Sequence, residues 1–491
     1  MPAIWGDITA KEIVSPISGS WVAGRKETVL RGLCTDSRNI GTGDLFWALK
    51  GERYDGHDFV EKAIEGGAAG IVVQENYWKD KDGVDSTGNL ASQEPAIISV
   101  HNTLKALGDL AGWWRHSHDV QVVAITGSAG KTTTKEMTAS IMELGHKTLK
   151  NQGNHNNLIG LPLTLVELDE RYRMAVLEMG MNRPGEIARL TEIADPDVGV
   201  ITNVGKVHLE ELGDIKGVAR AKSELVENMS SNSKVVLNGD DELLLKTASV
   251  FRKDALLFGL GEKNVVRASR IRNLGRDGVS FDLQYHGTSW PVRVRVPGLQ
   301  NVLNSLAAAA ACLCFNEPPE HIVEGLDCYA GLKGRFMITP LPGGVTLVDD
   351  TYNASPLSLK AGLESVSALV DGGSRVIVGL GEMLELGDAA VSAHQEAGQR
   401  VAELGACHFL VMGEHAYEMA KGAVKAGMPR DRVEVVTSHA EMVNRIKEEM
   451  REGDVVFLKA SRGMTFERVV EGLMGQQLQL NVPEINQTTD A

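Results

Sequence analysis

The stretch AITGSAGKTTTKEM, residues 124–137, has the residue types of a phosphate-binding loop. The common pattern G-x-x-x-x-G-K-[ST] requires a glycine at position 125, where this chain has Ile125. The apolar run VQVVAIT predicts a buried strand before the loop, and a helix is predicted over residues 131–144. The backbone N–H groups of residues 127–132 would then face one concavity at a helix start, which favours phosphate. We interpret the stretch as a shortened nucleotide-binding loop rather than a connecting glycine turn.

This interpretation gives the loop two chemical tasks. Lys131 would reach the β- and γ-phosphates of a nucleoside triphosphate, and the Thr132 hydroxyl would reach Mg²⁺. The residues predicted to contact the nucleotide are Gly127, Ser128, Ala129, Gly130, Lys131, Thr132 and Thr133.

Three residues farther along the chain are candidates for the metal site. Glu178 ends the apolar run AVLEMG and offers the carboxylate oxygen that Mg²⁺ prefers. His208 follows the next strand candidate, but a single histidine is more often structural than a ligand. Lys222 lies in the helical stretch GVARAKSELVE, where a solvated helix face is the more common fate of lysine.

The surrounding pattern predicts the scaffold that positions these residues. Strand-like runs alternate with helical stretches around the loop, which predicts a parallel sheet with helices on both faces. The stretch GVSFDLQYHGTSWPVRVRVPG alternates apolar and polar residues around HGTS and predicts a small antiparallel hairpin insertion. After Phe336 five strand candidates, from VTLVDD to DVVFLKAS, alternate with helices and predict a doubly wound domain of Rossmann type.

We therefore expect an α/β protein with three domains, which suits its 491 residues. Residues 1–118 form a first α/β domain, residues 119–335 the central nucleotide-binding domain, and residues 336–475 the Rossmann-like domain. The polar tail, residues 476–491, is expected to be disordered.

Composition excludes several classes of function. The net charge of -15 argues against a broad nucleic-acid surface, which needs a basic face. The five cysteines are not spaced like a zinc site and indicate reduced core residues. The first residues do not resemble a signal peptide, and the longest apolar run is too short to span a bilayer. We expect a cytoplasmic monomer without nucleic-acid or membrane partners.

Motifs spread over nearly the whole chain resemble the Mur ligase family of peptidoglycan synthesis. The stretches TGSAGKTTTKEM, NQGNHNNLIGLP, LEMGMNRPGEIARL, LKGRF and LKASRGMTFE occur in the order found in that family. The shortened loop T-G-x-x-G-K-T is itself a trait of the family. The stretch DDTYNASP most resembles the members that add D-alanyl-D-alanine, and it favours them over the diamino-acid-adding and folylpolyglutamate-type ligases.

The resemblance implies an ATP-dependent amide ligase that joins D-alanyl-D-alanine to UDP-N-acetylmuramoyl-tripeptide. ATP would phosphorylate the peptide carboxylate to an acyl phosphate, which the amine of the dipeptide would attack. Such a transfer needs mainly positioning and charge neutralisation. The alternatives are another ligase of the same superfamily, a non-catalytic nucleotide switch and a structural partner in cell-wall assembly.

The resemblance also implies the catalytic and cofactor residues. The metal site would hold two Mg²⁺ ions, with Lys222 as a carbamate that bridges the second. Arg335 would contact the γ-phosphate across the domain boundary, and Asp350 the ribose. Asn301 would contact the adenine, although a helix N-cap role is its alternative. The implied catalytic residues are Lys131, Lys222, His208 and Arg335, the metal residues are Thr132, Glu178, His208 and Lys222, and the adenine residues are Asn301 and Asn304.

The substrate-binding residues are likewise implied by matching motifs. The first domain would hold the uridine diphosphate, and the central domain the acceptor carboxylate. The Rossmann-like domain would hold the dipeptide, whose carboxylate would pair with Arg462. In this order the residues are Ser37, Arg38 and Lys50, then Asn156 and Asn157, then Asn353, Ala354, Pro356, Lys459 and Arg462.

Overall fold

The computed structural model describes residues 5, 8–51, 53–77, 95–370 and 374–475. The predicted disordered tail, residues 476–491, lies outside the described residues. In the part of the chain that the structure describes, no helix is long and apolar enough to cross a membrane.

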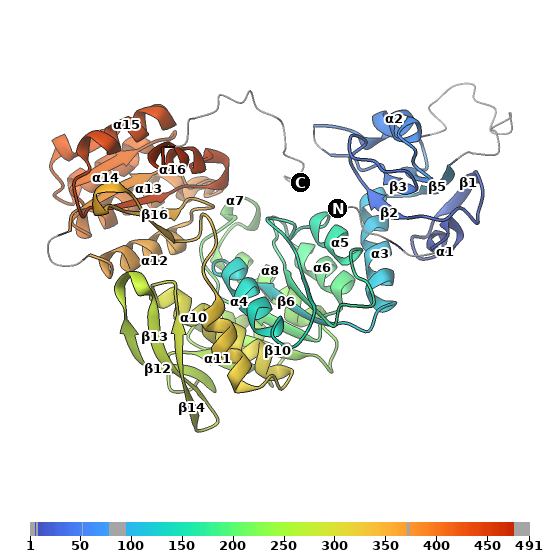
Figure 1. Cartoon of the computed structure of the whole chain (residues 1–491), viewed down its shortest axis with the longest axis horizontal. Coiled ribbons are helices and arrows are strands. Elements are labelled where there is room, and N and C mark those ends of the chain that lie inside the picture. Colours follow the sequence, from blue (N-terminus) through green and yellow to red (C-terminus); the bar gives the residue numbers. More distant parts are fainter. Residues whose placement is uncertain (1–4, 6–7, 52, 78–94, 371–373, 476–491) are drawn as a thin grey trace.

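Three sheets follow one another along the chain, each accompanied by helices (Figure 1). In the figure, the blue N-terminal unit and the orange-red C-terminal unit lie on opposite sides of the central unit, which is mostly green. The predicted α/β architecture is therefore confirmed. Each sheet lies within one of the predicted domain ranges, and the exact domain limits remain predictions.

The N-terminal sheet has five strands in the order β1-β5-β4-β3-β2. Strands β2 to β5 are parallel, and β1 pairs antiparallel with β5 at the edge. Because both faces are covered, β4 and β5 are almost wholly apolar. The bounds are β1 (Ser20–Ala23), β2 (Gly32–Cys34), β3 (Asp44–Trp47), β4 (Gly70–Gln74), β5 (Ala96–Val100), α1 (Ala10–Val14), α2 (Val60–Glu65) and α3 (Thr103–His116).

The central sheet has nine strands in the order β14-β13-β12-β11-β10-β9-β6-β8-β7. Alternate residues of β6 point to opposite faces, so that Val122 and Ala124 join one core while Val123 and Ile125 join the other. The strands are β6 (Gln121–Thr126), β7 (Thr148–Lys150), β8 (Met174–Glu178), β9 (Val198–Ile201), β10 (Lys234–Asn238), β11 (Leu256–Gly259), β12 (Val266–Asn273), β13 (Val279–Tyr285) and β14 (Thr288–Val294).

The predicted hairpin is formed by β13 and β14. Its turn residues, His286 and Gly287, both have positive φ, 46° and 81°, as a type I′ turn requires. The hairpin is not a separate insertion, because β13 pairs with β12 and so extends the edge of the parallel sheet.

Helices cover both faces of the central sheet. Helix α4 begins at Lys131 as predicted and ends at Met142, two residues early. In α10 the five alanines 307–311 are fully buried, which lets this helix lie close to the sheet and to α4. The helices are α4 (Lys131–Met142), α5 (Gly160–Leu165), α6 (Glu186–Ala194), α7 (Leu209–Leu212), α8 (Ile215–Asn228), α9 (Glu242–Ala248), α10 (Leu299–Cys314) and α11 (Pro319–Cys328).

The C-terminal sheet has six strands in the order β15-β16-β20-β17-β18-β19. Five are parallel and correspond to the five predicted strands, whereas β15 is an antiparallel edge strand that was not predicted. The elements are β15 (Met337–Pro340), β16 (Thr346–Asp350), β17 (Val376–Leu380), β18 (His408–Val411), β19 (Val433–Val435), β20 (Val455–Lys459), α12 (Pro356–Ser367), α13 (Ala390–Glu403), α14 (Ala416–Lys425), α15 (His439–Glu449) and α16 (Glu467–Leu473).

Candidate active site

The phosphate loop connects β6 to α4 and depends on two glycines. Gly127 and Gly130 have φ angles of 150° and 80°. A Cβ atom on Gly127 would lie 1.9 Å from the hydroxyl of Thr202, and one on Gly130 would lie 2.3 Å from Oδ1 of Asn304. Both positions therefore require glycine for conformation and for space.

Not all backbone N–H groups of the loop are free to bind a phosphate. The N–H groups of Ser128 and Ala129 donate to the carbonyl and side-chain oxygens of Asn203, at 3.0 Å and 2.9 Å. The prediction that all amides of residues 127–132 face one concavity is thus too broad. The first N–H groups of a helix have no intrahelical acceptor, so the amides at the start of α4 are the ones suited to phosphate.

The ammonium group of Lys131 and the carboxylate of Glu178, both predicted at the loop, lie close enough to interact electrostatically. Lys131 Nζ donates to the carbonyl of Gly127 at 3.0 Å, so its side chain folds back over the loop. Burial lowers the pKa of the Lys131 ammonium, and the carboxylate of Glu178 partly opposes this shift. A cation held in this way is ready to neutralise an anionic ligand at the loop.

Glu178 reaches the loop because β8 pairs with β6, opposite Ile125. Its Oε2 accepts a 2.7 Å hydrogen bond from the Thr132 hydroxyl, and its Oε1 accepts one of 2.9 Å from the side chain of Asn156. A carboxylate beside a hydroxyl is a set of hard oxygen donors, so these residues fit the predicted Mg²⁺.

Two residues that were not predicted hold Glu178 in place. The Asn151 side chain accepts from the backbone N–H of Glu178 and donates to its carbonyl, both at 2.9 Å. Lys135, only 1% exposed, donates to the Asn151 carbonyl at 2.5 Å. Lys135 lies one turn after Lys131 in a polar stretch, which in sequence is indistinguishable from a solvated helix face.

Lys222 on α8 is 1% exposed, so the interpretation as a solvated helix face is wrong. Burial, followed by the nearby charge of Lys131, places the pKa of Lys222 well below its ordinary value, while Glu178 and Glu224 oppose the shift. The structure thus brings Lys222 into the charge environment of Lys131 and Glu178.

His208 lies at the start of α7, with a left-handed φ of 50°. Its Nδ1 lies 2.6 Å from Oε2 of Glu385, which follows β17 in the C-terminal unit. The hydrogen bond from His208 lowers the pKa of the Glu385 carboxyl. His208 therefore ties the central unit to the C-terminal one through this nitrogen.

Arg335 and Asp350, both predicted to contact ATP, differ in their surroundings. Arg335 Nη2 donates to the Thr132 hydroxyl at 3.1 Å, which places its guanidinium at the phosphate loop as expected. Asp350 Oδ2 instead accepts from Lys459 Nζ at 2.6 Å. To make the predicted contact with the ribose, the Asp350 carboxylate would have to accept hydrogen bonds from both Lys459 and the ribose.

Asn301 and Asn304, the two residues predicted to contact the adenine, are both buried on α10. Helix α10 begins at Leu299 with Gly298 as its N-cap, so the alternative N-cap role for Asn301 is wrong. The Asn301 side chain donates to the Pro297 carbonyl at 2.8 Å, and Asn304 packs against Gly130.

The predicted dipeptide residues come together because β16 and β20 are neighbours, with Asp350 opposite Lys459. Lys459 also donates to the Asn353 carbonyl at 2.9 Å, and this contact ties the loops after the two strands. Arg462 is exposed and pairs with Glu467 at 3.1 Å. The two remaining predicted residues, Ala354 and Pro356, lie in the loop after β16 and at the start of α12.

The remaining predicted residues lie at two other places. Ser37 and Arg38 follow β2 and Lys50 follows β3, so all three lie at the carboxyl edge of the N-terminal sheet, where such sheets bind ligands. Asn156 contacts Glu178, whereas Asn157 uses its side-chain oxygen to accept from the backbone of residues 159 and 160.

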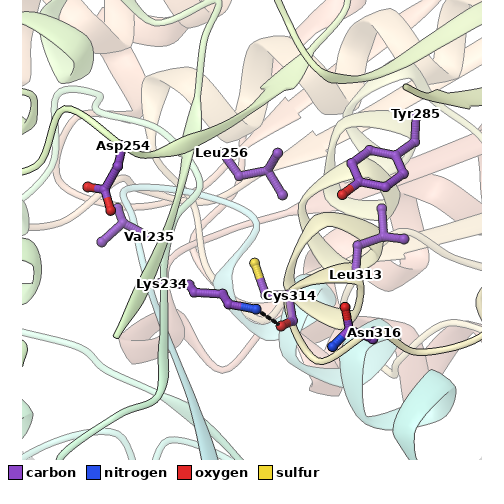
Figure 2. A pocket seen from close by; sticks show the side chains of 8 residues that line it. All are labelled: Lys234, Val235, Asp254, Leu256, Tyr285, Leu313, Cys314 and Asn316. Atoms are coloured by element: carbon purple, nitrogen blue, oxygen red, sulfur yellow. Dashed lines mark hydrogen bonds between the residues drawn. The ribbon is translucent and has the colours of Figure 1, made fainter. Parts of the chain in front are cut away.

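A cavity of about 210 Å³ lies away from these residues (Figure 2). It is located at the amino end of β10 and the carboxyl end of α10, where Lys234 donates to the carbonyl of Cys314. Burial raises the pKa of the Cys314 thiol to about 11, which favours the protonated thiol over the nucleophilic thiolate. None of the predicted site residues lines the cavity.

Within the described ranges, Glu382, His394 and His415 also have the residue types of a metal site. His415 Nδ1 lies 2.6 Å from Glu382. Both ring nitrogens of His394 are engaged, Nε2 by the N–H of Met383 at 2.9 Å and Nδ1 by the Ala390 carbonyl at 2.7 Å. We therefore assign this group a structural role in holding the loop after β17.

Comparisons with known proteins agree with this geometry. Three family descriptions match consecutive parts of the chain: "Mur ligase family, catalytic domain" residues 29–114, "Mur ligase middle domain" residues 125–312, and "Mur ligase, glutamate ligase domain" residues 334–462. The UDP-N-acetylmuramoyl-tripeptide–D-alanyl-D-alanine ligase of Bacillus subtilis is 34% identical over 96% of this chain and 99% of its own length. The Escherichia coli ligase of the same name is 32% identical over 91% and 94%.

Solved structures lead to the same family. MurF from Acinetobacter baumannii superposes with a TM-score of 0.83 and 32% identity, covering 95% of this chain and 98% of that one. The MurF ligase from Thermotoga maritima in complex with ADP has a TM-score of 0.78 and 28% identity, covering 90% and 97%. This chain belongs to the Mur ligase family.

Proposed function

We propose that this protein is the ATP-dependent ligase that joins D-alanyl-D-alanine to UDP-N-acetylmuramoyl-tripeptide in peptidoglycan precursor synthesis. The observation that carries the proposal is the convergence of three elements on one hydroxyl. The Thr132 hydroxyl of the phosphate loop donates to Glu178 at the end of β8. The same hydroxyl accepts from Arg335, which lies just before β15. The names of the relatives and the ADP in the Thermotoga structure support the substrate and the nucleotide.

The reaction has two balanced steps. An oxygen of the terminal peptide carboxylate attacks the γ-phosphorus of ATP, giving an acyl phosphate and ADP. The dipeptide amine then attacks the acyl carbon, a C–N bond forms, the C–O bond to phosphate breaks, and the amine loses a proton. Phosphorylation is needed because a carboxylate is a poor acylating agent at neutral pH. Lys131 and Arg335 neutralise the phosphoryl oxygens during the transfer.

The metal site would use the oxygens of Thr132 and Glu178. Mg²⁺, when bound, supplies positive charge at the phosphate oxygens. Asn151 and Lys135 fix the backbone of Glu178, so its carboxylate is held before any ligand arrives. His208 contributes to the same site in this proposal, with its Nδ1 oriented by Glu385.

We further propose that Lys222 carries a carbamate that helps hold a second Mg²⁺. A buried lysine with a lowered pKa is readily available as the neutral amine, which is the form that attacks CO₂. The amine nitrogen forms an N–C bond with CO₂ and loses one proton, which gives a carbamate anion that the Lys131 ammonium attracts. The uncharged amine lacks this attraction, so the carbamate adds a favourable interaction beside Lys131.

The substrate-binding roles follow the predicted residues. The edge of the N-terminal sheet would hold the uridine diphosphate through Ser37, Arg38 and Lys50, and the loops after β16 and β20 would hold the dipeptide. In this proposal Asn301 and Asn304 bind the adenine, and the protein acts as a cytoplasmic monomer.

Mass spectrometry of the product tests the proposal. Protein, ATP and D-alanyl-D-alanine are incubated with UDP-tripeptides that carry lysine or diaminopimelate at the third position. We expect a pentapeptide product with at least one acceptor and no product without ATP. Faster turnover with L-lysine, diaminopimelate or L-glutamate as the amine would overturn the assignment and favour another ligase of the superfamily.

A further inference from the structure

Tyr352 lies between two arginines that the proposed function assigns to different substrates. The guanidinium carbon of Arg335 lies 4.1 Å from the centre of the Tyr352 ring, and that of Arg462 lies 5.5 Å from it. Arg335 comes from the end of the central unit, and Arg462 from the loop after β20. One aromatic ring is therefore the shared contact of two cations from separate segments.

The backbone holds this ring close to Arg335. The N–H of Tyr352 donates to the Gly334 carbonyl at 3.0 Å, and the N–H of Gly334 donates to Asp349 at 3.0 Å. Gly334 has a φ of 74°, and a Cβ atom there would lie only 3.1 Å from Tyr352 Cβ. The segment before β15 and the segment after β16 are thus joined directly beside the ring.

The ring offers Arg335 a contact that its hydrogen bonds do not supply, whereas Arg462 also pairs with Glu467. Among the described residues, Nε of Arg335 is buried without a hydrogen-bond partner, although Nη2 of the same side chain reaches Thr132. The face of an aromatic ring attracts a cation electrostatically and favours a stacked guanidinium. Tyr352 therefore stabilises Arg335 in the orientation that points at the phosphate loop.

We propose that Tyr352 is a positioning residue that holds Arg335 at the transferring phosphoryl group and Arg462 at the carboxylate of the amine substrate. This inference rests on the proposed function. The two guanidinium carbons can be no farther apart than the sum of their distances to the ring. A fully extended dipeptide spans about 7 Å, which lies within this upper limit. Tyr352 thereby couples the phosphoryl site to an amine substrate two residues long.

The test compares Tyr352→Leu, which removes the ring, with Tyr352→Phe, which keeps it. We measure KM for each of the three substrates in the ligation assay. By calorimetry we measure the Kd of a non-hydrolysable ATP analogue and of ADP. We expect Tyr352→Leu to raise KM for D-alanyl-D-alanine and Kd for the analogue by about 3- to 30-fold. Values for UDP-tripeptide and for ADP, which lacks the γ-phosphate, should stay unchanged, as should all values in Tyr352→Phe.

The outcomes separate this inference from the proposed function. Unchanged KM and Kd values in a folded Tyr352→Leu protein would overturn the positioning role, as would equal impairment of Tyr352→Phe. If thermal unfolding shows that Tyr352→Leu is not folded, Tyr352→Met serves as the second variant without a ring. If the wild-type protein ligates no D-alanyl-D-alanine, the proposed function is wrong. In that case the Kd values of the ATP analogue and of ADP still test whether Tyr352 holds Arg335 at the γ-phosphate.

Discussion

Two buried lysines, Lys459 in the C-terminal unit and Lys222 in the central one, have opposite electrostatic surroundings. Burial is the largest cause of the lowered pKa in both. For Lys459 the next cause is the charge of Asp350, which lies 2.6 Å away and opposes the shift. For Lys222 the next cause is the charge of Lys131, which lowers the pKa further.

The difference separates a lysine that is paired with a carboxylate from one that lies near a second cation. Lys459 has its counter-ion inside the fold and joins the loops after β16 and β20 through Asp350 and Asn353. Lys222 and Lys131 share Glu178, whose carboxylate is already bonded to Thr132 and Asn156. A site with excess buried positive charge is suited to phosphates or to a carbamate, because these anions supply the missing charge.

The largest effect should be a loss of stability when the ion pair between Lys459 and Asp350 is broken. Lys459→Met leaves the Asp350 carboxylate without its cation and should lower the free energy of unfolding by about 3–5 kcal/mol. The double variant Lys459→Met/Asp350→Leu should recover most of this loss, since the carboxylate that Lys459 pairs with is then also removed. Denaturant unfolding of the two variants checks the prediction. A double variant as unstable as the single one would contradict the pairing.

Lys131→Ala should affect catalysis and leave the fold intact. Loss of the positive charge at the transferring phosphoryl group is expected to lower the ligation rate by about 10²–10³-fold. The measurement is ATP-dependent product formation, with thermal unfolding to confirm folding. Lys360→Ala, at an exposed lysine on α12, is the matched control and should retain wild-type turnover. Near wild-type turnover of a folded Lys131→Ala protein would remove the basis for the phosphate-loop role.

Lys222→Ala should lose about 10- to 100-fold in ligation rate and regain part of it with added acetate or formate. A short carboxylate can occupy the space of the carbamate and supply its negative charge. Lys459→Met should show no such rescue, because its function needs a cation. Full activity of Lys222→Ala would contradict a catalytic role. A loss of activity without rescue would contradict the carbamate.

The smallest effect should be a compaction on ligand binding. Two contacts, Arg335 with Thr132 and His208 with Glu385, already join the central and C-terminal units. Closure around the acyl phosphate should exclude water and so prevent its hydrolysis. We expect a small decrease in the radius of gyration by X-ray scattering when an ATP analogue and UDP-tripeptide are added together. An unchanged profile would contradict closure on ligand binding.

Much of the fold could be predicted because the signals are local. The apolar run of β6, the small residues of the loop and the helix that begins at Lys131 are contiguous, and so are the hairpin of β13 and β14 and the five parallel C-terminal strands. Strands β7 (TLK) and β15 (MITP) were missed because neither contains the apolar run that marks the predicted strands. They are strands because neighbours in the sheet supply their hydrogen bonds.

The sequence by itself determined the chemistry of the phosphate loop, since Gly130, Lys131 and Thr132 are adjacent in the chain. Only the tertiary structure decided which polar residues are buried and what they contact. The sequence pattern of α8 predicts a surface position for Lys222, which is buried only because α8 packs in the fold. Tyr352 contacts Arg335 and Arg462 only because three separate segments converge. Burial and charge proximity depend on contacts between distant segments, and local residue patterns carry no information about those contacts.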